Sequence, residues 1–142
     1  MNRILFYLLI LGSFSCSKEV RISKDLAGNW ELSSYKRTDS EGLVSYPNAS
    51  GQADFIAYEK SSDSSSCSWS IIMNVSGSLD TTSLQGTYKL VDKSNFMYVA
   101  EIDSLNQISA YTKYRILTLT QTDLQIEFSK NSNTDILLFR RN

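Results

Sequence analysis

The stretch Cys67-Ser68-Trp69-Ser70-Ile71-Ile72-Met73-Asn74-Val75 decides the fold class of this chain. Every odd-numbered position in it is apolar, and Ser or Asn occupies three of the four positions between. Side chains alternate between the two faces of a strand, so this period of two predicts a β-strand with one dry and one solvated face. Cys67 falls on the dry face, where burial keeps a thiol protonated and unreactive.

Seven further runs of aromatic and β-branched residues surround this strand. Clusters of Ser, Asn, Asp, Gly and Thr separate the runs, which is typical of an antiparallel β-meander. Eight strands with one apolar face each are enough to line a small closed barrel. We therefore predict an all-β fold, an eight-stranded antiparallel up-and-down β-barrel, in one domain over residues 26–142. The expected strands are residues 26–36, 52–60, 67–75, 84–91, 95–102, 113–120, 123–130 and 134–140.

The connections between the expected strands differ in length and polarity. Residues 38–51 form the longest connection, which we interpret as a candidate lid. Residues 61–66 are a serine-rich tract without an apolar side chain, which favours a solvated loop. Residues 103–112 carry apolar side chains at a spacing of three, which fits either one helical turn over a barrel end or a loop continuing the preceding strand.

Alternation also places large rings toward the barrel interior. Six such rings fill much of the space that an eight-stranded barrel encloses. This favours a packed core or a shallow pocket over a deep cavity. The inward rings are expected at Trp30, Phe55, Trp69, Tyr88, Tyr98 and Phe128.

The amino terminus has the three-part layout of an export signal. A basic start at Arg3 precedes an apolar run over residues 4–11, and small residues follow it. The run is far shorter than the roughly 20 residues that span a bilayer, so a signal peptide over residues 1–15 is predicted rather than a transmembrane helix.

Gly12-Ser13-Phe14-Ser15-Cys16 resembles the lipobox of bacterial lipoproteins. The resemblance implies lipidation of Cys16 with acyl chains such as palmitate, a lipidated tether over residues 16–25, and anchoring in the outer membrane. Lys18-Glu19 loosely resembles a surface-export signal, so the periplasmic and the cell-surface face both stay open. The alternative is a secreted protein whose cysteine lies near the cleavage point.

Leu26-Ala27-Gly28-Asn29-Trp30-Glu31-Leu32 resembles the first strand of lipocalin-like domains, which carries a Gly-x-Trp motif at Gly28 and Trp30. Gly86-Thr87-Tyr88-Lys89-Leu90 resembles the Gly-x-Tyr strand of small, Bacteroidetes-type lipocalin-like lipoproteins. The resemblance implies that Trp30 closes one barrel end beneath a basic side chain from near the last strand. Arg140 and Arg141 are the candidates for this role, which is structural.

Several chemistries have no residues to support them. The chain contains no histidine, which removes the commonest general base and metal ligand. Fourteen basic and fifteen acidic residues nearly cancel, so no basic field suits a nucleic acid. With Cys16 lipidated, Cys67 has no disulfide partner. We predict no enzymatic activity, no catalytic residues, no metal, no cofactor and no nucleic-acid partner.

Two functions of different classes fit these features. The first is a membrane-anchored lipoprotein whose non-catalytic barrel binds a small apolar ligand, with Tyr46, Tyr58 and Trp69 as the expected lining. The second is a structural or accessory lipoprotein that docks on an outer-membrane protein complex. Strands that are apolar on both sides favour the second, because such faces are usually covered.

Overall fold

A computed structural model describes residues 18–59, 62–75, 77–103, 105 and 107–142. The expected signal peptide and the expected lipidation site Cys16 lie outside these residues. The elements of the described part are α2 (Lys18–Leu26), β1 (Gly28–Asp39), β2 (Gly42–Ser45), β3 (Ser50–Phe55), β4 (Ser65–Val75), β5 (Ser78–Val91), β6 (Phe96–Ile102), β7 (Ile108–Leu119), β8 (Asp123–Lys130) and β9 (Asn133–Arg141).

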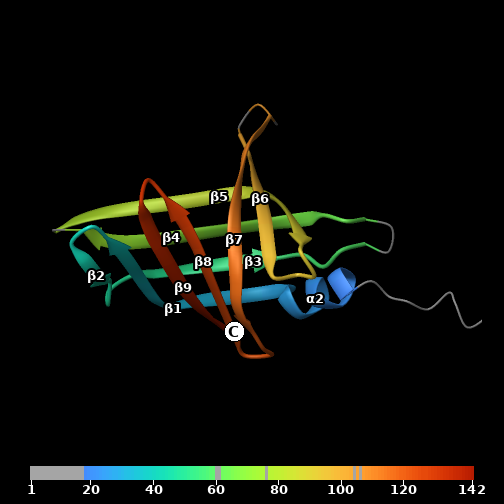
Figure 1. Ribbon diagram of the computed structural model, residues 1–142, viewed down its shortest axis with the longest axis horizontal. Helices are drawn as coiled ribbons and strands as arrows, with labels where there is room; N and C mark the ends of the chain where they lie inside the picture. Colours follow the sequence, from blue (N-terminus) through green and yellow to red (C-terminus); the bar gives the residue numbers. More distant parts are fainter. Residues whose placement is uncertain (1–17, 60–61, 76, 104, 106) are drawn as a thin grey trace, which may run out of the picture.

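The strands form a closed antiparallel barrel (Figure 1). From β3 to β9 each strand pairs with the next, and β9 pairs back onto β1. β3 and β2 both pair with β1, β3 along residues 28–31 and β2 along residues 36–39, so β2 continues the row of β3 rather than adding a ninth wall. The predicted eight-stranded antiparallel up-and-down β-barrel is therefore confirmed.

A β-bulge at Ser33 switches the side of β1 that faces the interior. The register with β9 shifts between Leu32 and Ser34, so Ser33 is an extra residue in this strand. Its hydroxyl donates a hydrogen bond to the Leu138 carbonyl at 3.2 Å. Before the bulge the even positions Trp30 and Leu32 are buried, whereas after it the odd position Tyr35 is buried. A bulge adds one residue and therefore reverses the alternation beyond it.

The barrel end at which β1 begins is closed by α2. Val20, Ser23 and Leu26 recur every three residues along one side of the helix, and Ser23 and Leu26 are fully buried. Trp30 donates a hydrogen bond from Nε1 to the Leu26 carbonyl at 2.8 Å, which ties the helix to β1. Gly28, between them, has φ of +122°, a conformation that favours glycine and turns the chain from helix into strand.

The core in this closed half consists of packed rings. The Phe55 and Tyr88 rings meet edge to face with centroids 5.5 Å apart, and the Tyr58 and Tyr88 rings lie 5.4 Å apart. The Tyr88 hydroxyl donates to the Ile56 carbonyl at 2.8 Å, so the polar tip of this buried ring is satisfied. The preference for a packed core describes this half of the barrel.

The structure differs from the sequence prediction at several places. The serine-rich tract over residues 61–66 ends within β4, and the expected strand over residues 52–60 is β3, which ends at Phe55. The expected tether forms most of α2. The helix was not predicted because charged residues surround its short apolar stripe. The candidate lid, residues 38–51, contains β2 and so belongs largely to the wall. Residues 103–112 include the start of β7 rather than a helical turn. Tyr98 lies outside the barrel, because Met97 and Val99 take the inward positions of β6.

Candidate functional site: a cavity at the open end of the barrel

A cavity of about 370 Å³ occupies the barrel interior at the end opposite α2. Its wall includes residues from the second half of β1 and the first half of β9, whereas α2 contacts the other ends of these strands. Ligand sites typically enclose ~300–1,000 Å³, so this cavity suits a small molecule. The barrel is thus filled in one half and hollow in the other.

Aromatic rings form the apolar side of the cavity. The Trp69 and Tyr114 rings meet edge to face with centroids 5.4 Å apart, and the Tyr114 and Phe128 rings lie 5.0 Å apart. Ile71 and Leu137 continue this wall. All five belong to β4, β7, β8 or β9, so strands far apart in sequence build one apolar surface.

A charged network continues the cavity wall beside Phe128, which pairs with Asp135 across β8 and β9. Asp135 is 2 % exposed, and its Oδ1 accepts hydrogen bonds from the Tyr35 hydroxyl and from Arg37 Nε, both at 2.7 Å. Arg37 Nη2 donates to the Tyr35 oxygen at 2.7 Å, which closes the ring of contacts. The hydrogen bond with Asp135 raises the pKa of Arg37, so the guanidinium stays charged. We call these three residues the interior triad.

Burial changes the acidity of several core groups. It raises the pKa of four tyrosines above the ordinary value of 10, and that of Tyr58 to about 12. Burial also raises the pKa of the Cys67 thiol to about 12, which agrees with its expected place on the dry face of β4. These phenols and this thiol are therefore neutral at physiological pH. The core tyrosines are Tyr35, Tyr58, Tyr88 and Tyr114.

The three residues expected to line a ligand site lie in different places. Trp69 lines the cavity. Tyr46 lines a separate hollow between β2 and the end of β4, and its ring stacks on Tyr35 with centroids 5.0 Å apart. Tyr58 lies in the closed half, where its hydroxyl accepts a hydrogen bond from the Leu90 amide at 2.5 Å. The structure does not bring these three side chains together.

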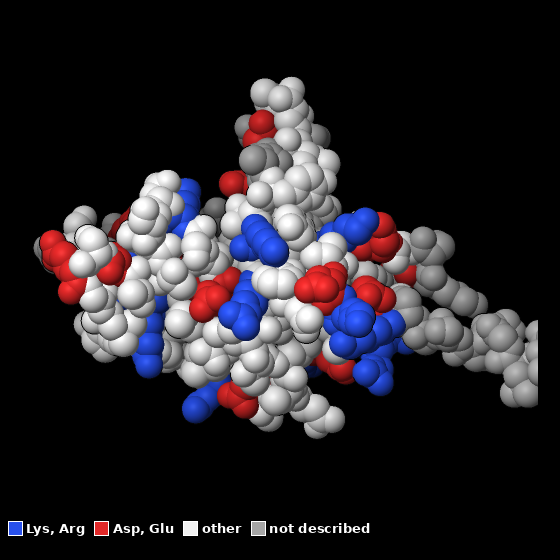
Figure 2. All heavy atoms as spheres, in the orientation of Figure 1, with Lys and Arg blue, Asp and Glu red and all other residues white. Residues whose placement is uncertain are grey.

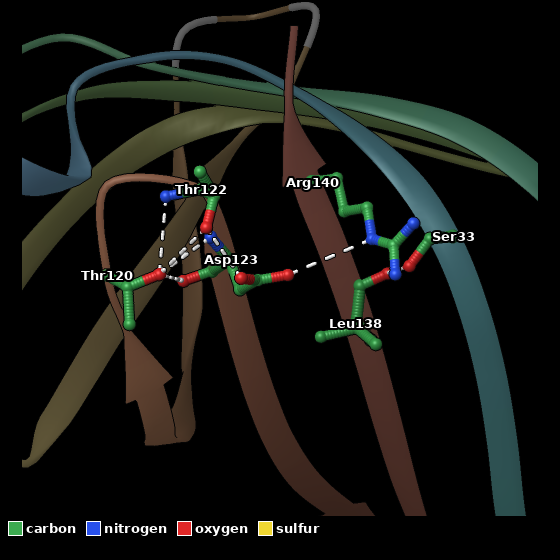
Figure 3. Close-up of polar contacts among 6 residues, drawn as sticks. All are labelled: Ser33, Thr120, Thr122, Asp123, Leu138 and Arg140. Atoms are coloured by element: carbon green, nitrogen blue, oxygen red, sulfur yellow. Dashed lines mark hydrogen bonds and ion pairs between the residues drawn. The ribbon is translucent and has the colours of Figure 1, made fainter.

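The two candidate arginines also have different surroundings. The Arg141 guanidinium lies 4.3 Å from the centroid of the Trp30 ring and donates to the carbonyls of Asp25 and Ala27. Arg140 extends along the outside of β9 toward Asp123, with 3.8 Å between Nε and Oδ1 (Figure 3). Arg141 therefore fastens the helix to the barrel end above the indole, and Arg140 takes no part in that contact.

Sequence reasoning missed the interior triad and Tyr114. Alternation through Trp30 and Leu32 points Ser34 and Lys36 inward, and the bulge that reverses this has no signature in the sequence. Asp135 did carry a signal, because it lies in phase with the apolar residues Leu137 and Phe139.

Charge and metal-ligand patterns on the described residues are unremarkable. Acidic and basic side chains are mixed over the face shown in Figure 2, without a large patch of one sign. Within the described ranges, no group of three or more Cys, Asp or Glu side chains is placed to hold a metal ion. The helix in that part of the chain is not long and apolar enough to cross a membrane.

No protein-family model matches the sequence, and no curated protein matches it significantly. The chain fold is similar to that of several solved structures, among them the following three. Japanin from Rhipicephalus appendiculatus, bound to cholesterol, is 15% identical over 80% of this chain and 73% of its own, with a TM-score of 0.48. A redesigned β-barrel is 13% identical over 86% and 96%, with a TM-score of 0.49. A triple mutant of bovine odorant-binding protein is 11% identical over 83% and 74%, with a TM-score of 0.44.

Proposed function

We propose that this protein is a lipid-anchored binding protein of the outer membrane whose barrel holds a small, largely apolar molecule in the cavity at its open end. The observation that carries this proposal is the shape of the barrel interior: rings fill the closed half, while about 370 Å³ is hollow in the other. Eight of the eighteen lining residues are aromatic or aliphatic and ten are polar or charged, so the cavity offers an apolar wall together with groups that can orient a ligand.

The burial of the lining supports binding rather than a surface groove. Trp69 is 7 % exposed and Tyr114 is 5 % exposed, so the wall that they form lies inside the barrel rather than on its surface. Burying apolar area contributes roughly 25 cal/mol per Å² to binding, before the cost of immobilising the ligand. Nothing in the lining offers an activated nucleophile, and we propose a non-catalytic role.

Tryptophan fluorescence tests this proposal directly. The chain has two tryptophans, of which Trp69 lines the cavity and Trp30 lies in the closed half. Titration with a panel of ketones, alcohols, sterols and fatty acids should change the emission of the wild type. The Trp69→Phe variant keeps only the distant indole and should show no change. Flat titrations of the wild type across the whole panel would refute the proposal.

The membrane anchor rests on the lipobox resemblance at Cys16. Growth with labelled palmitate should label the wild type and leave the Cys16→Ser variant unlabelled and released from the membrane fraction. Protease treatment of whole cells then distinguishes the two faces, since only a surface-facing barrel is digested without permeabilisation. A wild-type protein that carries no acyl chain would refute the anchor.

One observation favours the accessory role as a second candidate. The hairpin formed by β6 and β7 projects from the barrel (Figure 1), and Leu105, Ile108 and Tyr111 on it are 75 %, 58 % and 59 % exposed. Exposed apolar side chains clustered on a projection are typical of protein contacts. Purification from native membranes in mild detergent should then retain a stoichiometric protein partner, and the Leu105→Ser/Tyr111→Ser variant should lose it.

A further inference from the structure

The cavity contains hydrogen-bonding groups that no neighbouring residue satisfies. The Tyr114 side chain is only 5 % exposed, yet its hydroxyl has no hydrogen-bond partner among the described residues. Among the described residues, Ser94 Oγ is the side-chain polar atom that is both fully buried and without a hydrogen-bond partner. The Tyr114 hydroxyl also has no partner, so it is not fully buried. Tyr114 lines the cavity, so its hydroxyl is open to the cavity.

Two further hydrogen-bond donors on described residues of the cavity wall have no acceptor. Trp69 Nε1 has no acceptor among the described residues, and neither does Nη1 of Arg37, whose Nε and Nη2 are engaged in the interior triad. An indole and a guanidinium can only donate hydrogen bonds, and a tyrosine hydroxyl can donate one. Burial raises the pKa of Tyr114, which keeps that proton in place at physiological pH. An acceptor oxygen on a ligand would satisfy any of these three donors.

The charges of the cavity wall argue against a carboxylate as that acceptor. Arg37 is already paired with Asp135 through a 2.7 Å contact. Over the whole lining, two cations face three carboxylates, which leaves a net charge of −1. An anion would lose its hydration shell on entry without meeting a compensating positive field. The charged residues of the lining are Arg37, Lys130, Asp80, Glu101 and Asp135.

We infer that the natural ligand is an uncharged apolar compound bearing a carbonyl oxygen, such as a ketone, ester or lactone, and that this oxygen accepts a hydrogen bond from Tyr114. The inference rests on the proposed binding function and names its ligand class. The cavity of about 370 Å³ lies near the lower end of the ~300–1,000 Å³ of typical ligand sites, which limits the ligand to a small compound of this class. The hydrocarbon part lies against the rings of Trp69 and Phe128.

Three probes of nearly equal size distinguish a carbonyl ligand from a plain hydrocarbon and from a carboxylate. They are methyl heptyl ketone, nonane and octanoate. Competition against a cavity-bound fluorescent probe gives their affinities for the full chain. One added neutral hydrogen bond should make the ketone bind about three- to tenfold more tightly than nonane. Octanoate should bind more weakly than the ketone at neutral pH, because its charge must be desolvated.

The Tyr114→Phe variant tests the donor. It removes a hydroxyl without a protein partner and keeps the ring contacts, so we expect it to fold. Its affinity for nonane should be unchanged, and its preference for the ketone should fall to less than about twofold. Tyr98→Phe makes the same change on the outside of β6 and should keep the full preference. The infrared carbonyl band of the bound ketone should lie at lower frequency in the wild type than in Tyr114→Phe.

The outcomes are distinguishable. A ketone preference that disappears in Tyr114→Phe supports the inference. Equal affinity for all three probes, or a preference that survives in Tyr114→Phe, overturns the inference and leaves the binding function intact. Tightest binding of octanoate overturns it in favour of an anion site at Arg37. Failure of all three compounds to displace the fluorescent probe overturns the inference alone, whereas failure of the fluorescent probe itself and of the whole ligand panel to bind overturns the proposed function as well.

Discussion

Replacement of Asp135 by Asn should destabilise the protein markedly, although Asn has nearly the same volume. The Asp135 carboxylate is almost fully buried and accepts two hydrogen bonds of 2.7 Å, from the Tyr35 hydroxyl and from Arg37 Nε. The substitution removes the charge that compensates the guanidinium and leaves a neutral amide oxygen as the acceptor. The loss should therefore come from electrostatics, because no cavity is created.

The magnitude follows from the exposure of the two partners. Breaking a fully buried ion pair costs ~3–5 kcal/mol, because one charge is left without a partner. The Arg37 side chain is 32 % exposed and can recover part of its hydration through the cavity mouth, which reduces the cost. We expect a loss of about 2–3 kcal/mol, equivalent to a fall in Tm on the order of 10 °C for a domain of this size.

Urea denaturation followed by circular dichroism measures this loss of stability, and a double-mutant cycle tests whether it comes from the pair of Asp135 with Arg37. In the Arg37→Met background the effect of Asp135→Asn should shrink by more than ~1 kcal/mol, since the charge to be compensated is gone. Glu127→Gln is the matched control at an exposed pair, with 3.8 Å to Arg115, and should change stability by less than ~0.5 kcal/mol. Additive effects of Asp135→Asn and Arg37→Met would refute the reasoning.

Three further predictions concern the closed end and the core. Arg141→Ala should lower stability by about 1–2 kcal/mol in urea denaturation, because a cation–π contact and hydrogen bonds to the carbonyls of Asp25 in α2 and of Ala27 just after it are lost. Arg140→Ala should cost less than ~0.5 kcal/mol, and equal effects would contradict this assignment. Stability should fall as the pH rises above ~10, because the unfolded chain ionises its tyrosines there while burial keeps the pKa of the core tyrosines higher, that of Tyr58 at about 12. Phenolate absorbance should show the core tyrosines titrating only as circular dichroism reports unfolding, and reversible titration of all tyrosines near pH 10 in the folded state would argue against their burial. In the Cys16→Ser variant, Cys67 should react with a thiol reagent only after denaturation, and rapid labelling of the native protein would show that the thiol is accessible.

The barrel itself was predictable because its signal is repeated along the whole chain. Several strands alternate apolar and polar residues, and turn-forming residues separate the strands, so errors at single positions do not alter the fold class. The predicted strand over residues 67–75 lies within β4, and the one over residues 123–130 coincides with β8. Gly28 and Trp30 could also be assigned to the closed end through their family resemblance.

The cavity was less predictable because it depends on register rather than on composition. Trp69 was found from alternation within a single strand. Tyr35 and Arg37 were missed because a bulge lies between them and the residues used to set the phase. Tyr58 was placed in the expected site although it belongs to the closed half, because the expected strand ran to residue 60 whereas β3 ends at Phe55 and Tyr58 lies beyond it.

The bulge at Ser33 also bears on how β1 can change in length. Deleting this one residue would place Ser34 directly after Leu32, so Ser34 and Lys36 would still face outward and Tyr35 and Arg37 would still face the cavity. A single in-frame deletion at this position would therefore shorten the strand without exchanging the side chains of the cavity. An alignment of this chain with a relative that lacks the bulge residue needs a gap at Ser33. Without that gap it would assign the wrong side chains to the interior.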